Sequence, residues 1–123
     1  ELLYWNTQSG AQIRSSDSFH DTKWHTQTCK LGWSVHGIWD MKLYNDGTDV
    51  NYVDANFDLS LLAVADGKGL VSLYRYPTVN KHPKCQRVTG HCSHVTRVKF
   101  TSDNQHLISG GGGDLTLIQH KIL

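Results

Sequence analysis

Short stretches in which apolar and polar residues alternate recur along this chain, and turn signals such as NDGTD, DGKG and SGGGGD separate them. Alternation with period two, rich in Val, Leu, Ile, Thr and Tyr, is typical of β-strands with one buried face, and helical spacing is hard to find. The pattern predicts an all-β chain. The expected strands are residues 2–6, 23–30, 50–56, 60–66, 70–76, 85–89, 95–100, 106–110 and 115–122.

The second half of the chain contains an internal repeat. The stretch VNYVDANFDLSLLAVADGKGLVSLY superposes on VTRVKFTSDNQHLISGGGGDLTLIQH at a shift of about 45 residues, so that Val50 falls on Val95, Val53 on Val98 and Leu62 on Leu107. A period near 45 with four short strands per unit is that of a β-propeller blade. The repeat predicts a partial propeller of about two and a half four-stranded blades. Residues 1–49 would supply outer strands of a preceding blade and a linker, 50–89 a complete blade, and 90–123 a last blade without its outer strand.

Composition and charge limit the function classes. The 123 residues include twelve Lys and Arg against eleven Asp and Glu, for a formal net charge of +1. A nucleic-acid or membrane-surface role therefore has no electrostatic support. The longest uninterrupted apolar run, LLAVA, is far too short to span a bilayer. Three cysteines fit neither a disulfide framework nor a CxxC pair, which favours a reducing compartment.

The segment GHCSHVTRVKF, residues 90–100, raises two interpretations. It holds His91, Cys92 and His94 close to Cys85, which is the residue set of a zinc site and, by extension, of a metal-dependent hydrolase. The spacing lacks regular paired ligands, however, and alternation along a strand points neighbouring side chains to opposite faces. We therefore expect no bound metal here, and the hydrolase stays as the alternative hypothesis.

The other interpretation of this segment is a structural motif. The Gly90–His91 pair, the strand VTRVKF, the stretch LISG and Asp114 resemble the WD-repeat pattern. In that family a His, a strand Ser, a turn Asp and a Trp form a hydrogen-bonded structural chain. The resemblance implies the same chain for His91, Ser109 and Asp114, ending at His120 where Trp is usual. The earlier unit has no Gly-His pair and carries Tyr74 at the aromatic position, so its blade would depend more on packing.

The first half of the chain is more specific. WHTQTCKLG at residues 24–32, GIW at 37–39 and DGTD at 46–49 stand in this order before LLAVADGKGLVSLY and the repeat just described. The ordered set covers essentially the whole chain and resembles the C-terminal blades of the echinoderm microtubule-associated-protein-like family. Gly67 and Lys68 after Asp66, together with His120, depart from the family pattern and indicate a divergent member. Among the Trp residues, Trp33 is the candidate for an interaction, because linkers present binding residues more often than strands do.

Catalysis has little support in the sequence. No GxSxG, HExxH or P-loop motif occurs, and the glycines at 110–113 run into a turn Asp and a strand rather than into a helix that could cradle phosphate. The resemblance instead implies a non-catalytic scaffold that mediates protein–protein interaction without a cofactor. Its implied partners are tubulin, microtubules or microtubule-associated proteins, besides the rest of its own propeller. The implied location is the cytoplasm and cytoskeleton.

Overall fold

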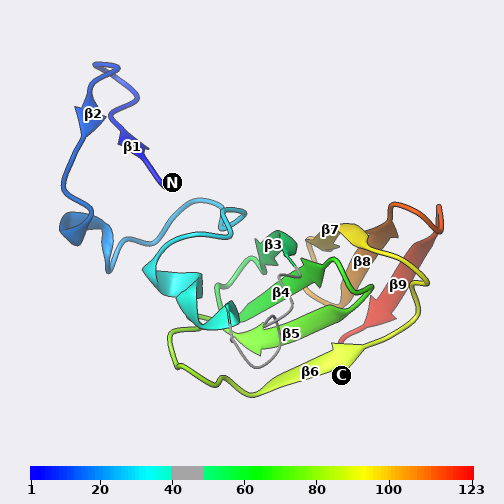
Figure 1. Cartoon of the computed structure of the whole chain (residues 1–123). Coiled ribbons are helices and arrows are strands. Elements are labelled where there is room, and N and C mark those ends of the chain that lie inside the picture. The colour runs from blue at the N-terminus through cyan, green and yellow to red at the C-terminus, as the bar shows by residue number, and fades with distance from the viewer. Residues whose placement is uncertain (40–48) are drawn as a thin grey trace.

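The computed structural model describes residues 1–39 and 49–123, and these residues form three antiparallel sheets (Figure 1). The first sheet has two strands, β1 (Tyr4–Trp5) and β2 (Gln12–Ile13). The second sheet has four, in the order β3 (Val50–Ala55), β4 (Leu61–Asp66), β5 (Val71–Arg75) and β6 (Cys85–Val88). The third has three, in the order β7 (Val95–Phe100), β8 (His106–Gly111) and β9 (Leu117–Lys121). Two 3-10 helices, η1 (Asp17–Phe19) and η2 (Trp33–Ile38), lie between β2 and β3. The predicted all-β class is confirmed.

The two larger sheets repeat the same construction, as the sequence repeat predicts. In the second sheet the register shifts between Val50 and Tyr52, and in the third it shifts at the equivalent point, between Val95 and Arg97. Tyr74 pairs with Leu62 in the second sheet, and His120 pairs with Leu107 in the third. Residues 45 or 46 positions apart therefore occupy equivalent places in successive sheets.

The third sheet packs face to face on the second. Apolar side chains of β4 and β5 form one cluster with side chains of β7 and β8, which are Ala63, Ala65, Val71, Val95, Val98, Phe100 and Leu107. Small residues at 63 and 65 let the two sheets approach closely, and the larger Val, Phe and Leu side chains of the third sheet fill the space between them. Burial of this apolar area holds the two units together.

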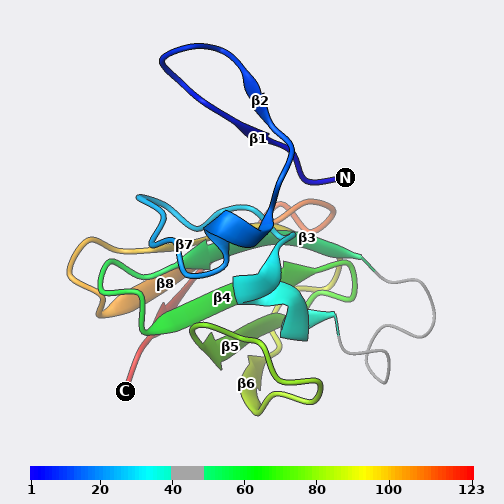
Figure 2. The ribbon, with the colours of Figure 1, turned by 90° about the vertical axis from the view of Figure 1, so that its left-hand side faces the viewer.

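The opposite face of the second sheet is covered by a helix instead of by another sheet. Val35 and Ile38 of η2 are fully buried and pack against Val53, Leu62 and Tyr74. Figure 2 shows η2, in cyan, lying over β4 and β5. The helix is fixed by backbone bonds to the segment after β5, because the Gly37 amide donates to the Thr78 carbonyl and the Thr78 amide donates to the Ser34 carbonyl. The sequence analysis did not predict the helix η2 on this face of the sheet.

One predicted strand is wrong. Residues 23–30 form no strand, and β1 pairs instead with β2, which lies just after the turn that follows Trp5. Asn6 makes that turn locally, since its side-chain oxygen accepts from the amides of Gln8 and Ser9. Residues 2–6 and 23–30 therefore do not pair as the outer strands of one blade, because a tight local hairpin satisfies β1 first. Figure 1 shows this hairpin standing apart from the larger sheets.

Residues 27–30 nevertheless contact the edge of β3. The carbonyl of Gln27 accepts a bond of 3.1 Å from the Ala55 amide, and Nζ of Lys30 donates to the Val50 carbonyl over 2.6 Å. The Gln27 side chain is buried and bonds to the Cys29 carbonyl, the Ser34 hydroxyl and the Tyr76 hydroxyl. These side-chain bonds hold the segment in an irregular conformation, although its Thr-rich composition favours a strand.

Polar bonds join β3 to β7 at equivalent positions. The buried carboxylate of Asp54 accepts from the Phe100 amide over 2.9 Å and from Nζ of Lys99 over 2.7 Å. Nδ2 of Asn51 donates to the Val95 carbonyl over 2.8 Å. The carbonyl and the amide that Asn51 and Asp54 satisfy on β7 are thus the counterparts of those that residues 27–30 satisfy on β3.

Candidate functional site

Four polar side chains from separate parts of the third sheet form one hydrogen-bonded chain. His91 precedes β7, Ser109 lies in β8, Asp114 in the turn that follows, and His120 in β9. Nδ1 of His91 lies 3.0 Å from Oδ2 of Asp114, and Nε2 of His91 lies 2.8 Å from Oγ of Ser109. Oγ of Ser109 lies 2.9 Å from Nε2 of His120. The four residues implied by the WD resemblance are therefore in mutual contact.

The direction of each hydrogen bond follows from the ends of the chain. An ionised carboxylate can only accept, so Nδ1 of His91 donates to Asp114. Nε2 of the neutral His91 ring then accepts from the Ser109 hydroxyl, and the Ser109 oxygen accepts from an Nε2–H group of His120. The His91 side chain is 1% exposed and Ser109 is fully buried, so these bonds satisfy polar groups of His91 and Ser109 that water does not reach. His120 can stand in for a tryptophan here because its imidazole also offers a ring N–H donor.

Asp114 is held as a carboxylate by several donors. Burial acts to raise the pKa of its carboxyl, but bonds from the Cys92 amide, the His91 ring and Thr116 outweigh burial and lower this pKa to about 2. The Thr116 hydroxyl also lies 3.1 Å from Nδ1 of His91. At the other end, burial lowers the pKa of His120, and repulsion from the protonated form of His91 lowers it further.

The order Asp114, His91, Ser109 has the contacts of a hydrolase triad, but the site does not present a nucleophile. A catalytic serine must reach the carbonyl of a substrate, with an oxyanion site beside it. Ser109 is fully buried in the middle strand of its sheet, and its oxygen already accepts from His120. In this arrangement the same three residue types hold a sheet and its flanking loop together.

The four residues of the alternative metal site make separate contacts. Both ring nitrogens of His91 are engaged, by Asp114 and Ser109, whereas Cys85 packs against the apolar cluster beneath η2. Cys92 is exposed, and Nδ1 of His94 lies 3.1 Å from the Ser93 hydroxyl. Within residues 1–39 and 49–123, no group of three or more His, Cys, Asp or Glu side chains is placed to hold a metal ion.

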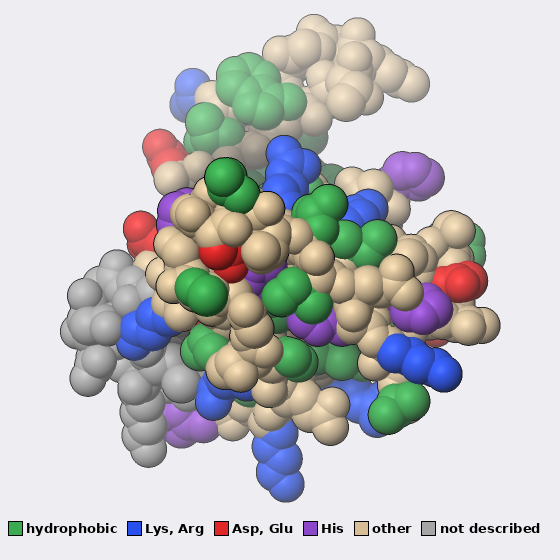
Figure 3. All heavy atoms as spheres, turned by 90° about the vertical axis from the view of Figure 1, so that its right-hand side faces the viewer, with side chains coloured by type: hydrophobic (Ala, Val, Ile, Leu, Met, Phe, Trp, Pro, Cys, Tyr) green, Lys and Arg blue, Asp and Glu red, His purple; other side chains and the backbone are tan. Residues whose placement is uncertain are grey.

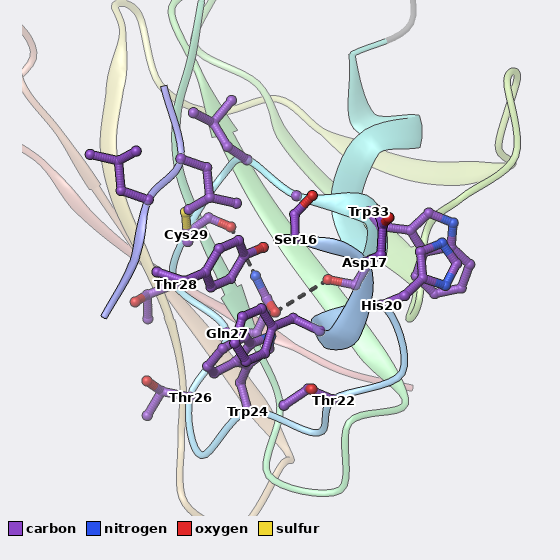
Figure 4. A pocket seen from close by; sticks show the side chains of 17 residues that line it. Ser16, Asp17, His20, Thr22, Trp24, Thr26, Gln27, Thr28, Cys29 and Trp33 are labelled. Atoms are coloured by element: carbon purple, nitrogen blue, oxygen red, sulfur yellow. Dashed lines mark hydrogen bonds between the residues drawn. The ribbon is translucent and has the colours of Figure 1, made fainter. Parts of the chain in front are cut away.

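Trp33 is the first residue of η2 rather than part of a loop, and its side chain is partly exposed. Its ring lies over the ring of His20, with 3.7 Å between the ring centroids. A cavity of about 530 Å³ lies beside this pair, between residues 2–4 and residues 16–34. Figure 4 shows Trp33 and His20 together on one side of it and Trp24 on another. Trp24 joins Tyr4 and Phe19 in a second group of stacked rings.

Comparison with known proteins decides the family. The family model described as the second β-propeller of echinoderm microtubule-associated protein matches residues 1–122. The chain belongs to this family. A 77 kDa echinoderm microtubule-associated protein from Lytechinus variegatus is 42% identical over all of the chain. The echinoderm microtubule-associated protein-like 4 of Mus musculus and the like 2 protein of Homo sapiens are each 39% identical over all of it.

The family assignment turns the repeated sheets into blades of a partial WD-repeat propeller. The chain spans only 12% of the length of the mouse relative, 19% of the human one and 18% of the sea-urchin one. The names of these relatives describe microtubule-associated proteins. In the described part of the chain, none of the helices has the length and apolar character needed to cross a bilayer.

The sequence did not predict the contacts of several residues in this structure. Thr116 and the Cys92 amide complete the cradle of Asp114, and a hydroxyl two residues after the turn Asp was the available signal for the first of them. Asp54 and Gln27 gave no signal, because their contacts are made by residues distant in sequence. The DGTD stretch used for the resemblance falls mostly at residues 46–48, outside the described residues.

Proposed function

We propose that this chain is a non-catalytic WD-repeat scaffold segment of a microtubule-associated protein and that it mediates protein–protein interaction. The observation that carries the proposal is the match of residues 1–122 to a propeller of a family whose members are named for microtubule association. The buried Ser109 supports it, because a sealed hydroxyl suits a structural role. Cytoplasm and cytoskeleton are the corresponding location.

The proposed partner is tubulin, polymerised in microtubules, or a protein bound to them. The test is co-sedimentation of the complete propeller with polymerised tubulin, compared with an unrelated propeller of similar size and charge. Pelleting above that comparison is expected, and pelleting no greater than it would contradict the proposal. Trp33→Ala tests the interaction role of Trp33, with Trp5→Ala as the matched control because Trp5 is also an exposed indole. A loss of pelleting in the first variant alone assigns the contact to Trp33, and equal pelleting of both variants removes Trp33 from it.

The chain of His91, Ser109, Asp114 and His120 has a structural role in this proposal. His91→Ala should lower the free energy of unfolding by about 1–3 kcal/mol, because it leaves a cavity and deprives buried polar groups of their partner. His94→Ala is the control, since His94 lies in the same loop and is exposed. Unfolding of the intact protein in denaturant measures both variants. Equal stability of His91→Ala and the natural protein would remove the structural role.

The rest of the protein's own propeller is the second proposed partner. The second sheet has four strands and the third has three, so β9 occupies the place of a strand that has a neighbour in the preceding blade. Figure 3 shows the side of the molecule on which the third sheet lies, where hydrophobic side chains are exposed among Lys and Arg side chains. Ile108 and Leu117 are exposed on the third sheet. We infer that a fourth strand, donated by a segment outside these 123 residues, pairs with β9 in the intact protein. The corresponding blade boundaries, which are part of this proposal, are residues 50–89 and 90–123, with a linker within 1–49.

The inferred strand can be tested by cross-linking. Cysteine introduced at Gln119, which faces neither His91 nor Ser109, should form a cross-link to a segment outside residues 1–123 in the intact protein. Cysteine introduced at Gln86, in the outer strand of the complete blade, is the control. Cross-links of Gln119→Cys that map only to residues 50–89 would contradict the inferred fourth strand beside β9.

A further inference from the structure

Two imidazole rings share one buried hydroxyl in the third sheet. Oγ of Ser109 lies 2.8 Å from Nε2 of His91 and 2.9 Å from Nε2 of His120, and Ser109 is fully buried. A hydroxyl has one proton to donate, so it can donate to only one of the two rings. The other ring must carry a proton on its Nε2 atom and donate to the oxygen. The number of protons on the two rings therefore decides whether this three-residue contact is satisfied.

With both rings neutral, the contact has one favourable arrangement. Nδ1 of His91 faces the Asp114 carboxylate and keeps its proton, so Ser109 donates to Nε2 of His91 and His120 donates to Ser109. One added proton can be accommodated by reversing the direction of the bonds. His91 then donates to Asp114 and to Ser109, Ser109 turns its proton toward Nε2 of His120, and the neutral His120 ring keeps its proton on Nδ1. Every bond survives, and the positive charge lies beside a carboxylate.

A second proton has no such solution. Both rings then donate to the Ser109 oxygen, and the hydroxyl proton of the fully buried Ser109 has no remaining acceptor among these side chains. Two positive rings also face each other across one oxygen atom. An unsatisfied buried donor and repulsion between like charges both oppose this state.

We propose that His91, Ser109 and His120 form an acid-sensitive latch, which holds β9 to the rest of its sheet while the pair of rings carries at most one extra proton and releases it when a second proton binds. This contact links β9 to the loop that precedes β7. His91 belongs to that loop, Ser109 to the middle strand β8, and His120 to β9. Release would loosen the outermost described strand of the blade and leave the inner strands paired. The lowered pKa of His120 agrees with this mechanism, since burial and the His91 charge both oppose its protonation.

The charged groups around the two rings come from several elements, and the β4–β5 turn that lies against the His91 carbonyl at Gly69 carries Asp66 and Lys68. On the same face of the third sheet, β7 and β8 present Val98, Phe100 and Leu107. His106 and Lys121 pair with each other and lie on the opposite face by register, because their neighbours Leu107 and His120 form the next pair. From the facing second sheet, register places Tyr52, Asp54 and Arg75 on this side, and Asp54 is already bonded to Lys99. Asp114 remains the counter-charge and acts on His91 directly.

The experiment compares the intact natural protein with His120→Gln. A glutamine amide does not titrate, and it can present either an N–H group or an oxygen to Ser109, so it suits both protonation states of His91. His106→Gln is the matched control, because it removes a histidine from the neighbouring strand without touching Ser109. Hydrogen exchange of the β9 amides is measured between pH 7.5 and pH 5 and corrected for the intrinsic pH dependence of exchange.

The natural protein and His106→Gln should lose protection of β9 as pH falls below the ordinary histidine pKa of 6.5, by up to about tenfold per pH unit, because the released state binds one more proton than the closed state. His120→Gln should show no such loss. Equal acid dependence in all three proteins, or none in the natural protein, overturns the proposal. If His120→Gln does not fold, imidazole nitrogen resonances of the natural protein decide. Protonation of His120 that coincides with loss of β9 protection supports the latch, and protonation of His120 with β9 still protected overturns it.

Discussion

Asp54 allows the sharpest test of how adjacent blades are joined. Its carboxylate is almost fully buried and accepts from the Phe100 amide over 2.9 Å and from Nζ of Lys99 over 2.7 Å. Asp54→Ala removes a bond to a charged acceptor, worth about 1.5–3 kcal/mol, and leaves the Phe100 amide without this partner in a buried site. Part of that cost will be recovered by relaxation or water, so we expect a net loss of about 3 kcal/mol.

Asp54→Asn separates the hydrogen bond from the charge. Its side-chain oxygen can still accept from the Phe100 amide, and Lys99 loses only a partner at a position where its own side chain is 65% exposed. An ion pair with one solvated member contributes little, so this variant should lose about 1 kcal/mol or less. The ratio between the two variants, rather than either value alone, identifies the amide bond as the stabilising contact.

Native-state hydrogen exchange of the intact protein is the suitable assay, because it reports the Phe100 amide itself. A loss of about 3 kcal/mol corresponds to roughly 100-fold lower protection, against about fivefold for a loss of 1 kcal/mol. Lys99→Gln serves as the control for the charge and should resemble Asp54→Asn. If Asp54→Ala and Asp54→Asn lose equal protection at Phe100, the acceptor role of Asp54 is refuted. If neither loses protection, the polar connection between β3 and β7 contributes nothing to stability.

Three further predictions follow from other contacts. Gly37→Ala should destabilise the protein by about 1–3 kcal/mol in denaturant unfolding, because the added methyl group would lie 2.5 Å from the Asn80 carbonyl oxygen and 2.8 Å from that of Thr78; unchanged stability would show that η2 can shift on its sheet. The Asp114 pKa of about 2 lies below its ordinary 3.8, so its contribution to stability is complete above pH 3.8 and is lost as pH falls through 2. Acid unfolding should show this loss in the natural protein and not in Asp114→Asn, and identical acid profiles would contradict it. The isolated 123 residues should be marginally stable, because Ile108 and Leu117 are exposed and have no neighbouring sheet packed on them. A cooperative monomeric transition at about 45–65 °C in a thermal melt would contradict this.

The predictable part of the fold is the part that repeats. Alternation located the strands from β3 to β9 to within a few residues, most clearly in β7, where buried Val98 and Phe100 flank exposed Lys99. Residues 23–30 show the limit, since their composition favours a strand while Gln27 bonds to Ser34 and Tyr76 and keeps the backbone irregular. The helix η2 could not be predicted for a similar reason. The apolar pattern of Val35 and Ile38 is too short to predict a helix, and only the sheet beneath them explains their burial.

The polar chain of the last blade was accessible from the sequence because the family pattern fixes its spacing. His91, Ser109, Asp114 and His120 are separated by up to 29 positions in the chain, and the shared blade geometry brings them together. Asp54 has no such pattern behind it. Its role depends on β3 and β7 running side by side, which becomes evident only when the two blades are seen packed together.

The contact of residues 27–30 with β3 limits where a further repeat could be inserted. On β7, the Val95 carbonyl and the Phe100 amide are taken by side chains of the preceding repeat, whereas on β3 the equivalent Val50 carbonyl and Ala55 amide are taken by a non-repeating segment. The third sheet carries Thr96 and Lys99 at the positions equivalent to Asn51 and Asp54, so it does not offer the same donor and acceptor to a further strand. A duplicated 45-residue unit inserted immediately before β3 would have to displace Gln27 and Lys30, and the helix η2 with them. In evolution by unit duplication, an insertion immediately before β3 would therefore break contacts that the described blades already make.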